Sequence, residues 1–239
     1  MFILRGRHFF ISVEVSADPR LVISIVTLFL AGVKAISIND TFKGSDLVGQ
    51  VFNPGPPSLT VASWMWTNSS GVTGVPPGSS SFRLTFHPAS VFPLANISVA
   101  ISTDNAYNLY LNGTLVGSAL DWTAPNVWTI LNVPPNGPWI FSILATNYAD
   151  PVGLNPAGII ASFRASNDAQ QAFYDWYTGQ IAIPSVVWKA NPAVPNNFAS
   201  STFDDSAWAN AVIEAPFGGG PWGILPAPVP ATLCNLKPF

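Results

Sequence analysis

The feature that most restricts the fold of this chain is an alternating run, Tyr107–Leu111, that leads directly into the pair Asn112-Gly113. A second strand-like run follows at once, and another alternating run precedes Asp104-Asn105. Asn-Gly accepts positive φ at both central turn positions, which matches the right-handed twist of a tight hairpin. The segment 96–117 is therefore predicted to form a three-stranded meander.

The rest of the chain consists of short β-branched and aromatic runs, separated by many of its 23 prolines and 18 glycines. No amphipathic helix is evident after the N-terminal segment. This pattern predicts an all-β fold, an antiparallel β-sandwich. Asp204 or Asp205 is expected to cap a helical turn ending at Trp208, and 167–179 to form a loop or irregular hairpin. Strands are expected at 59–66, 81–87, 97–103, 106–111, 114–117, 127–133, 139–146, 158–165, 182–189 and 211–215.

Several short motifs resemble those of galactose-binding-like (jelly-roll) domains, and they occur in the usual order over 58–223. The resemblance implies a jelly-roll fold and a sugar-related setting. Such domains accompany family 2 and rhamnosidase-type glycosidases and occur in many secreted fungal proteins. It carries over no binding residue, because members of this fold differ in their ligand loops. The motifs are D-N-x-Y-x-L-Y-x-N-G at 104–113, A-x-N at 145–147 with P-A-G-I-I-A at 156–161, V-W-K at 187–189, F-D-D-S-x-W at 203–208 and P-W-G at 221–223.

The first 35 residues are predicted to be a signal peptide. Arginines at positions 5, 7 and 20 precede the apolar run Leu21–Val33, and Val33-Lys34-Ala35 offers a cleavage site. The run is too short for a stable membrane span. Because Glu14 and Asp18 lie in the long segment before it, a signal anchor and a misplaced start codon remain alternatives. The expected organisation is then a lead-in over 36–57, the β-sandwich over 58–223 and a Pro-rich tail over 224–239.

The low charge of the chain points to a secreted glycoprotein, extracellular or in a cell wall. Only 9% of the residues are charged, against about 25% in an average soluble domain. Such a surface needs another source of solubility, and N-linked glycans would supply it. Four sequons are present, beginning at Asn39, Asn68, Asn96 and Asn112.

After residue 35 the chain has five basic and ten acidic residues, a net charge of −5. No basic patch is present, so nucleic acid is not an expected partner. The single cysteine, Cys234, can form no internal disulfide. It either pairs with another chain or remains a free thiol.

No catalytic constellation is evident after residue 35. His87 is the only histidine there, and no Gly-x-Ser-x-Gly motif accompanies it. Zinc or copper would need more His or Cys ligands than the chain supplies. Glu214 is the only glutamate there, and most aspartates lie at predicted turns. The sequence therefore predicts a non-enzymatic protein without a cofactor.

A structural calcium ion is the one metal kept as an alternative. Loop carboxylates and carbonyl oxygens suit this hard cation, and jelly rolls of the resembled type often hold one. The candidate ligands are Asp40, Asp46, Asp204 and Asp205. No spacing in the sequence selects among them.

Carbohydrate binding needs aromatic faces for sugar rings beside polar groups for their hydroxyls. Most of the nine tryptophans lie in strand-like runs or in fold motifs, where core packing explains them. Trp122 beside Asp121 and Trp176 beside Asp175 are the remaining pairs. These four residues are the predicted ligand-binding residues, with packing of the rings on neighbouring loops as the alternative.

The expected function is binding of glycans or cell-wall polysaccharide through loops at one end of the sandwich. Two alternatives stay open. One is a structural, self-associating extracellular matrix protein, because the chain is aromatic and poor in charge. The other is an orphaned accessory domain of a glycoside hydrolase, with the Pro-rich tail as a former linker.

Overall fold

The computed structural model describes residues 2–6, 9–13, 55–68, 71–88, 95–134, 137–149, 155–166, 172–180 and 187–235. The chain forms two compact units, 1–52 and 53–239. In the first unit, β1 (Phe2–Gly6) pairs antiparallel with β2 (Phe9–Val13). The apolar run 21–33 lies outside the described residues, so the signal peptide stays a prediction. Within the described part of the chain, no helix is both long and apolar enough to cross a bilayer.

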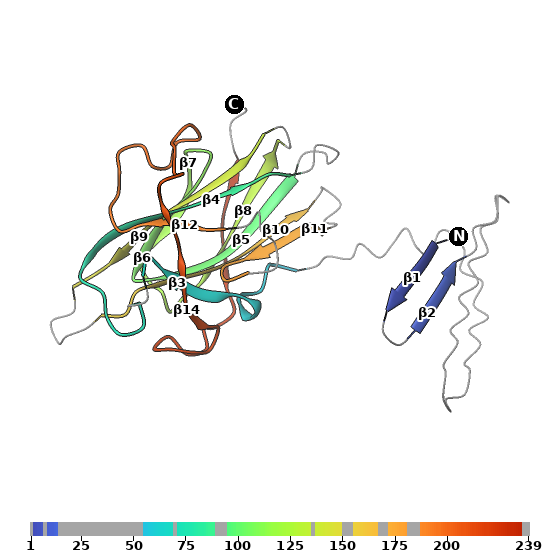
Figure 1. The fold of residues 1–239 in the computed structure, drawn as a ribbon, viewed down its shortest axis with the longest axis horizontal. Helices are drawn as coiled ribbons and strands as arrows, with labels where there is room; N and C mark the ends of the chain where they lie inside the picture. Colours follow the sequence, from blue (N-terminus) through green and yellow to red (C-terminus); the bar gives the residue numbers. More distant parts are fainter. Residues whose placement is uncertain are drawn as a thin grey trace. The chain divides into compact units, whose positions relative to one another are not determined.

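The second unit is a β-sandwich, which confirms the predicted fold class (Figure 1). Its strands are β3 (Ser63–Trp66), β4 (Gly78–Phe86), β5 (Ala95–Asp104), β6 (Ala106–Leu111), β7 (Thr114–Ala119), β8 (Asn126–Val133), β9 (Trp139–Asn147), β10 (Gly158–Ser166), β11 (Ala172–Tyr177), β12 (Lys189–Asn191), β13 (Ala209–Asn210), β14 (Val212–Pro216) and β15 (Val229–Asn235). One sheet has the order β14-β3-β10-β5-β8-β15, with β11 also beside β10, and the other has the order β13-β12-β4-β9-β6-β7. The pairings are antiparallel except that of β15 with β8.

The predicted hairpin is present as β6 and β7. β6 has the predicted bounds, and Asn112 and Gly113 take φ values of 48° and 85°. Asn112 also fixes the turn to β9, since its Oδ1 accepts a hydrogen bond from Ile140 N (2.8 Å). Local turn chemistry therefore determines this part of the fold, as the sequence predicts.

Three segments differ from the predicted strands and loops. Leu59–Val61 is a 3-10 turn rather than part of a strand. Of the predicted strand 182–189, residues 182–186 lie outside the described residues and only Lys189 belongs to a strand, β12. β15 lies in the expected tail. The segment 167–179 contains β11, which pairs antiparallel with β10 through a shifted register, as the hairpin alternative predicts. Pro230 is compatible with β15 because an edge strand needs no hydrogen bond from every backbone nitrogen. The described sandwich therefore continues to residue 235, beyond the predicted boundary at 223.

The main core lies between the two sheets and is rich in aromatic rings. Trp176 stacks on Phe163 and on Phe86, with ring centroids 5.3 and 4.6 Å apart. Trp66 at the end of β3 packs against Phe82 of β4 at 5.3 Å. Aromatic pairs of this kind each contribute about 0.5–1.5 kcal/mol beyond the burial of their surface.

A second apolar cluster covers the outer face of the seven-stranded sheet. Along β10, Ile159 belongs to the inter-sheet core and Ile160 to this outer cluster, as alternation along a strand requires. The segment after β14 supplies the cover, because Trp222 stacks on Trp64 with centroids 4.4 Å apart. Gly158 permits this stack, since a Cβ there would lie 2.8 Å from Trp222 and 2.9 Å from Trp64.

A buried arginine explains the F-D-D-S-x-W motif. Arg83 is 1% exposed and binds Asp205 through Nε (2.8 Å), while its Nη1 donates to Ser200 O (3.0 Å). The motif forms a hydrogen-bonded turn, with Trp208 N donating to Asp205 O (2.9 Å), rather than a helical turn. Asp204 caps this turn by accepting from Ser206 N (2.9 Å). The two adjacent aspartates therefore have separate structural roles.

Candidate functional site

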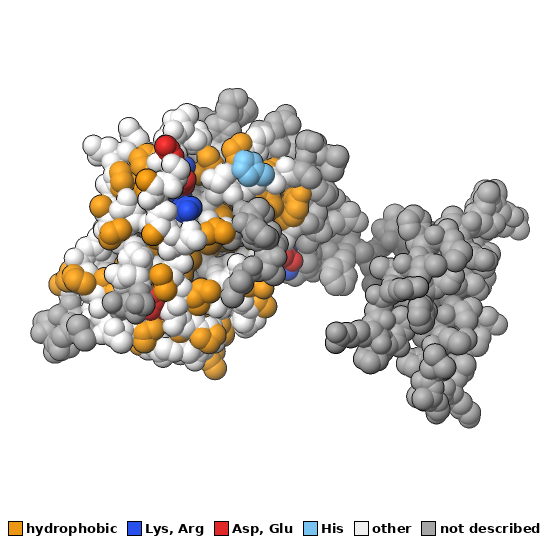
Figure 2. Space-filling model, in the orientation of Figure 1, with side chains coloured by type: hydrophobic (Ala, Val, Ile, Leu, Met, Phe, Trp, Pro, Cys, Tyr) orange, Lys and Arg blue, Asp and Glu red, His pale blue; other side chains and the backbone are white. Residues whose placement is uncertain are grey.

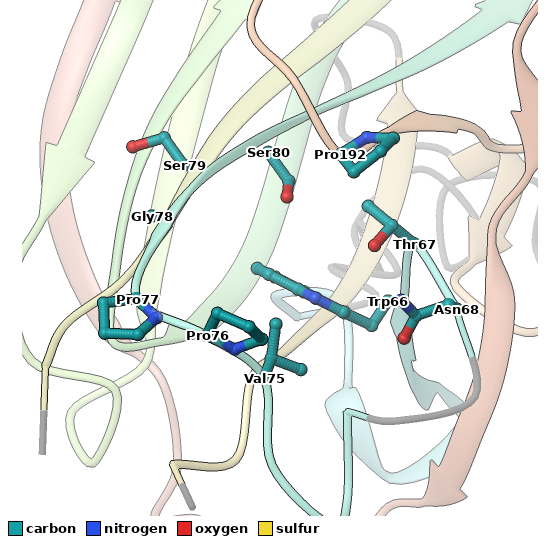
Figure 3. Close-up of a pocket in the computed structure, with 10 residues that line it drawn as sticks. All are labelled: Trp66, Thr67, Asn68, Val75, Pro76, Pro77, Gly78, Ser79, Ser80 and Pro192. Atoms are coloured by element: carbon teal, nitrogen blue, oxygen red, sulfur yellow. The ribbon is translucent and has the colours of Figure 1, made fainter.

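A hollow of about 290 Å³ lies at the end of the sandwich where β3 ends and β4 begins (Figure 3). It is lined by residues 66–68, 75–80 and Pro192, and we call it the Trp66 depression. It is brought together from three separate stretches of chain, because β3 and β4 belong to different sheets and Pro192 follows β12. The sequence marks Asn68 among them as a sequon asparagine, but it predicts none of them as a ligand-binding residue.

Trp66 forms the centre of the depression. Figure 3 shows Thr67 and Ser80 on one side of its ring and Val75 and Pro76 on the other. The Trp66 side chain is 1% exposed, and its indole Nε1 has no hydrogen-bond partner among the described residues. This nitrogen is itself buried, and the indole nitrogens of Trp64, Trp176 and Trp188 have the same environment, so it does not by itself mark a ligand site.

The proline wall of the depression is held in place by an asparagine. Asn147 is 1% exposed, and its Nδ2 donates to Val75 O (2.9 Å) and to Pro76 O (3.4 Å). Asn155 supports it from behind, since its Nδ2 lies 2.8 Å from Asn147 Oδ1. The backbone of Val75 pairs with Asn155 as an isolated bridge. A network of this kind fixes the position of a wall that has no regular structure of its own.

The same network includes Asn105, the second residue of the D-N motif. Its Oδ1 accepts from Tyr148 N (2.7 Å) and from Asn155 Nδ2 (3.3 Å). The D-N and A-x-N motifs therefore meet at the end of the sandwich where the Trp66 depression lies. The order of these motifs along the sequence predicts the fold, but it does not indicate that they meet at this end of the sandwich.

The lining of the depression carries no charge. None of its residues is Asp, Glu, Lys, Arg or His. The cations in the described part of 55–235 bind groups outside the depression. Arg83 binds Asp205, Arg164 binds Asp175, and Lys189 donates to Trp208 O. Figure 2 shows a face made mostly of uncharged and hydrophobic side chains, with only small spots of charge. The depression therefore suits an uncharged polar ligand.

One buried carboxyl group, Asp104, and one half-buried carboxyl group, Glu214, have raised pKa values. Asp104 Oδ2 accepts from Trp222 Nε1 (2.9 Å), and burial raises the pKa of Asp104 to about 6 although this bond opposes the shift. Glu214 Oε2 accepts from Val72 N (3.3 Å), and burial raises the pKa of Glu214 as well. Each carboxyl group has a second oxygen without a partner among the described residues.

The predicted pair Asp121 and Trp122 lies in the loop between β7 and β8. Asp121 Oδ1 accepts from Thr123 N (2.9 Å) and Thr123 Oγ1 (2.6 Å), so it stabilises the turn, although its side chain is exposed. Trp122 is half-buried, packs against the outer cluster, and accepts at its carbonyl from Ser102 Oγ (2.6 Å). Their role as ligand-binding residues stays a prediction.

The expectation of an exposed ring at Trp176 is wrong. Trp176 is 1% exposed in the inter-sheet core, where it has no face free for a sugar. Asp175 is exposed, but it forms a two-point ion pair with Arg164, at 2.7 and 3.1 Å. Because successive residues of a strand point to opposite faces, Asp175 and Trp176 cannot share one surface site.

The calcium alternative has no assembled site among the described residues, which contain no group of three metal-ligating side chains. Asp204 and Asp205 are engaged as described above, and Asp40 and Asp46 lie outside the described residues. A structural calcium ion is therefore left as a prediction without a defined site.

The three sequon asparagines among the described residues occupy different places on the sandwich. Asn68 is exposed and lines the depression. Asn112 is at the hairpin turn, and Asn96 in β5 accepts from Asn132 N (3.2 Å). Asn39 lies outside the described residues. Whether any of the four carries a glycan stays a prediction.

Comparison with known proteins supports the fold. The sequence matches no protein-family model. It is 26% identical over 191 residues to an α-L-rhamnosidase of Streptomyces avermitilis, which covers 76% of this chain but only 17% of that enzyme. The chain thus spans about a sixth of the length of this relative.

Solved structures give the same result. A lectin from Pleurotus ostreatus, solved in complex with GalNAc, superposes with a TM-score of 0.61 at 21% identity, covering 72% of this chain and 48% of the lectin. The S. avermitilis α-L-rhamnosidase complexed with L-rhamnose superposes at 0.58 with 24% identity, covering 73% and 17%. At these identities the likeness shows the fold alone. The resemblance to a galactose-binding-like jelly roll of the kind found in rhamnosidase-type proteins is thus confirmed.

Proposed function

We propose that this protein is a carbohydrate-binding β-sandwich whose glycan site is the Trp66 depression. The observation that carries the proposal is an uncharged depression in which prolines lie beside the hydroxyl and amide side chains of Thr67, Asn68 and Ser80. Sugar recognition combines an apolar surface with hydrogen bonds to hydroxyls. Here the prolines of the wall supply the first, and Thr67, Asn68 and Ser80 supply the second. A fungal lectin among the structural neighbours supports the same reading.

A neutral glycan is the ligand that this chemistry favours. Anionic sugars would need a basic side chain, and the described cations of the sandwich are bound elsewhere. Burial of a carboxylate beside uncharged groups is unfavourable unless it is paired. The ligand is therefore an uncharged mono- or oligosaccharide, from a glycoprotein or from cell-wall polysaccharide.

The role is proposed to be non-catalytic and extracellular. Asp104 is 4% exposed and bound to Trp222 Nε1, and Asp205 is paired with Arg83, so neither is placed as a free general acid or base. Secretion rests on the predicted signal peptide and the sequons. Incubation with a chromogenic α-L-rhamnoside is expected to release no product, and mass spectrometry of the secreted protein would locate its N-terminus.

The test of the site is a glycan array followed by titration calorimetry with the glycan bound best. The variant Thr67→Val, Ser80→Ala removes two hydroxyls beside Trp66 while changing little volume. It is expected to weaken binding by about fivefold to about a hundredfold, because the two lost hydrogen bonds together contribute about 1–3 kcal/mol. The matched control Thr114→Val, Ser118→Ala alters β7, away from the depression, and should bind like the wild type. Equal binding by both variants would exclude the depression.

A second candidate is an accessory domain of a glycoside hydrolase. The match to 17% of a rhamnosidase favours it, since the similarity covers one part of that enzyme. An accessory domain is expected to bind the same sugar as its enzyme. Binding of L-rhamnose in preference to N-acetylgalactosamine would favour this candidate, and the reverse preference would favour a lectin-like protein.

A further inference from the structure

One sequon begins inside the proposed glycan site. Asn68 follows β3 directly, is exposed, and lines the Trp66 depression. Figure 3 shows its side chain directed from the end of β3 back toward Trp66. An N-linked glycan is attached to the side-chain amide of an Asn-x-Ser/Thr sequence. A glycan on Asn68 would therefore start at the rim of the depression.

We propose that N-glycosylation of Asn68 covers the Trp66 depression and so controls the access of external glycans to it. The inference rests on the proposed function in so far as the depression is the glycan site. The attached sugar presents the same chemistry as the proposed ligand, hydroxyl groups beside apolar ring faces. It therefore meets Thr67 and Ser80 in the same way.

Tethering gives the attached sugar a large advantage over a free one. A ligand joined by a short flexible link reaches an effective concentration in the mM range. The depression is about 290 Å³, so it holds little beyond the first sugars of one chain. The attached glycan then excludes an external glycan of weak affinity from the depression. Only the protein without a glycan on Asn68 binds external glycans.

The other sequons in the described part of the chain do not share this position. Asn112 lies at the β6–β7 turn, where Leu111 pairs with Phe141, whereas the depression lies near the opposite end of β9, where Gly78 pairs with Asn147. Asn96 in β5 faces Asn132. A glycan on either residue would leave the depression open, which provides matched controls.

The full chain, secreted from a eukaryotic host, tests the inference. Peptide mass spectrometry is expected to find a glycan on Asn68. Ser70→Ala removes that sequon and keeps Asn68, while Thr114→Ala removes the Asn112 sequon. On the array, Ser70→Ala should bind at least about tenfold more tightly than the wild type, and Thr114→Ala should match the wild type. Unmodified Asn68, or equal binding by all three proteins, would overturn the proposal.

A second readout needs no external ligand. In a Cys234→Ser background, Ser80→Cys places a thiol on the depression wall and Ser118→Cys places one on exposed β7. Alkylation of the thiol at position 80 should be at least about tenfold slower with the Asn68 glycan than in Ser70→Ala, with no change at position 118. Equal rates at position 80 would refute the covering. If position 80 is alkylated slowly in the glycosylated protein but Ser70→Ala binds no glycan on the array, the Asn68 glycan covers the depression and the proposed function is wrong.

Discussion

Protonation of Asp104 is expected to control how the stability of the sandwich depends on pH. Asp104 is 4% exposed at the end of β5, and burial raises its pKa from 3.8 to about 6. Between these values the folded protein binds more protons than the unfolded chain, so the free energy of unfolding falls as pH rises. A shift of about 2 units at 1.36 kcal/mol per unit corresponds to about 3 kcal/mol. The loss occurs between about pH 4 and pH 6 and is complete above that range.

The variant Asp104→Asn isolates this effect. The amide has nearly the same shape and keeps an oxygen acceptor for Trp222 Nε1, but it does not titrate. Urea unfolding of both proteins, followed by tryptophan fluorescence between about pH 4 and pH 7, gives the free energies. The difference in the free energy of unfolding between the variant and the wild type should change by about 3 kcal/mol across this pH range. Near neutral pH the variant should be at least as stable as the wild type. Glu214 titrates in the same direction in both proteins, so it cancels in the difference.

If the free energy of unfolding falls equally with rising pH in the wild type and in Asp104→Asn, Asp104 is not the responsible group. Asp175→Asn provides the control for an exposed carboxylate. Its ion pair with Arg164 lies at the surface, where such pairs contribute about 0–1 kcal/mol. A control variant that removed as much pH dependence as Asp104→Asn would also refute the argument from burial.

Three further changes test the packing of the sandwich. Arg83→Met should cost about 3–5 kcal/mol in urea unfolding, because it leaves Asp205 and several carbonyls without their donor, and Asp205→Asn should cost less. Gly117→Ala should cost about 1–3 kcal/mol, since its Cβ would lie 2.3 Å from the Trp128 ring, and a neutral result in the same assay would refute that clash. Asn147→Ala should cost about 1–3 kcal/mol and also weaken glycan binding; loss of stability with unchanged affinity would show that the proline wall is not part of the site.

Local features of the sequence were enough to predict the fold. The Asn112-Gly113 turn depends on its own two residues and on the alternation beside it, so it needed no tertiary information. The strands predicted around it follow the same period-two pattern. β15 is not predicted because its parallel pairing with β8 joins strands separated by more than 90 residues, which no local pattern records. Prolines in the segment also lowered its apparent strand character.

Trp176 shows why exposure of a single aromatic residue was not predictable. The run Tyr174-Asp175-Trp176 is equally compatible with a loop and with an edge strand, and only pairing with β10 decides which. Once paired, Trp176 lies opposite Phe163 and is directed into the core, while Asp175 is directed to solvent. An Asp-Trp dipeptide is therefore a candidate for one shared site only where the backbone is not a strand.

The two residues of the D-N motif face different parts of the molecule, which bears on what the resemblance can transfer. Asp104 accepts a hydrogen bond from Trp222 on the outer face, whereas Asn105 joins the network behind the Trp66 depression. Both act on the backbone arrangement rather than on the lining itself. The lining depends instead on residues outside the motifs, such as Thr67 and Ser80. Domains that share these motifs but differ at the lining positions are therefore expected to keep this fold and bind a different glycan.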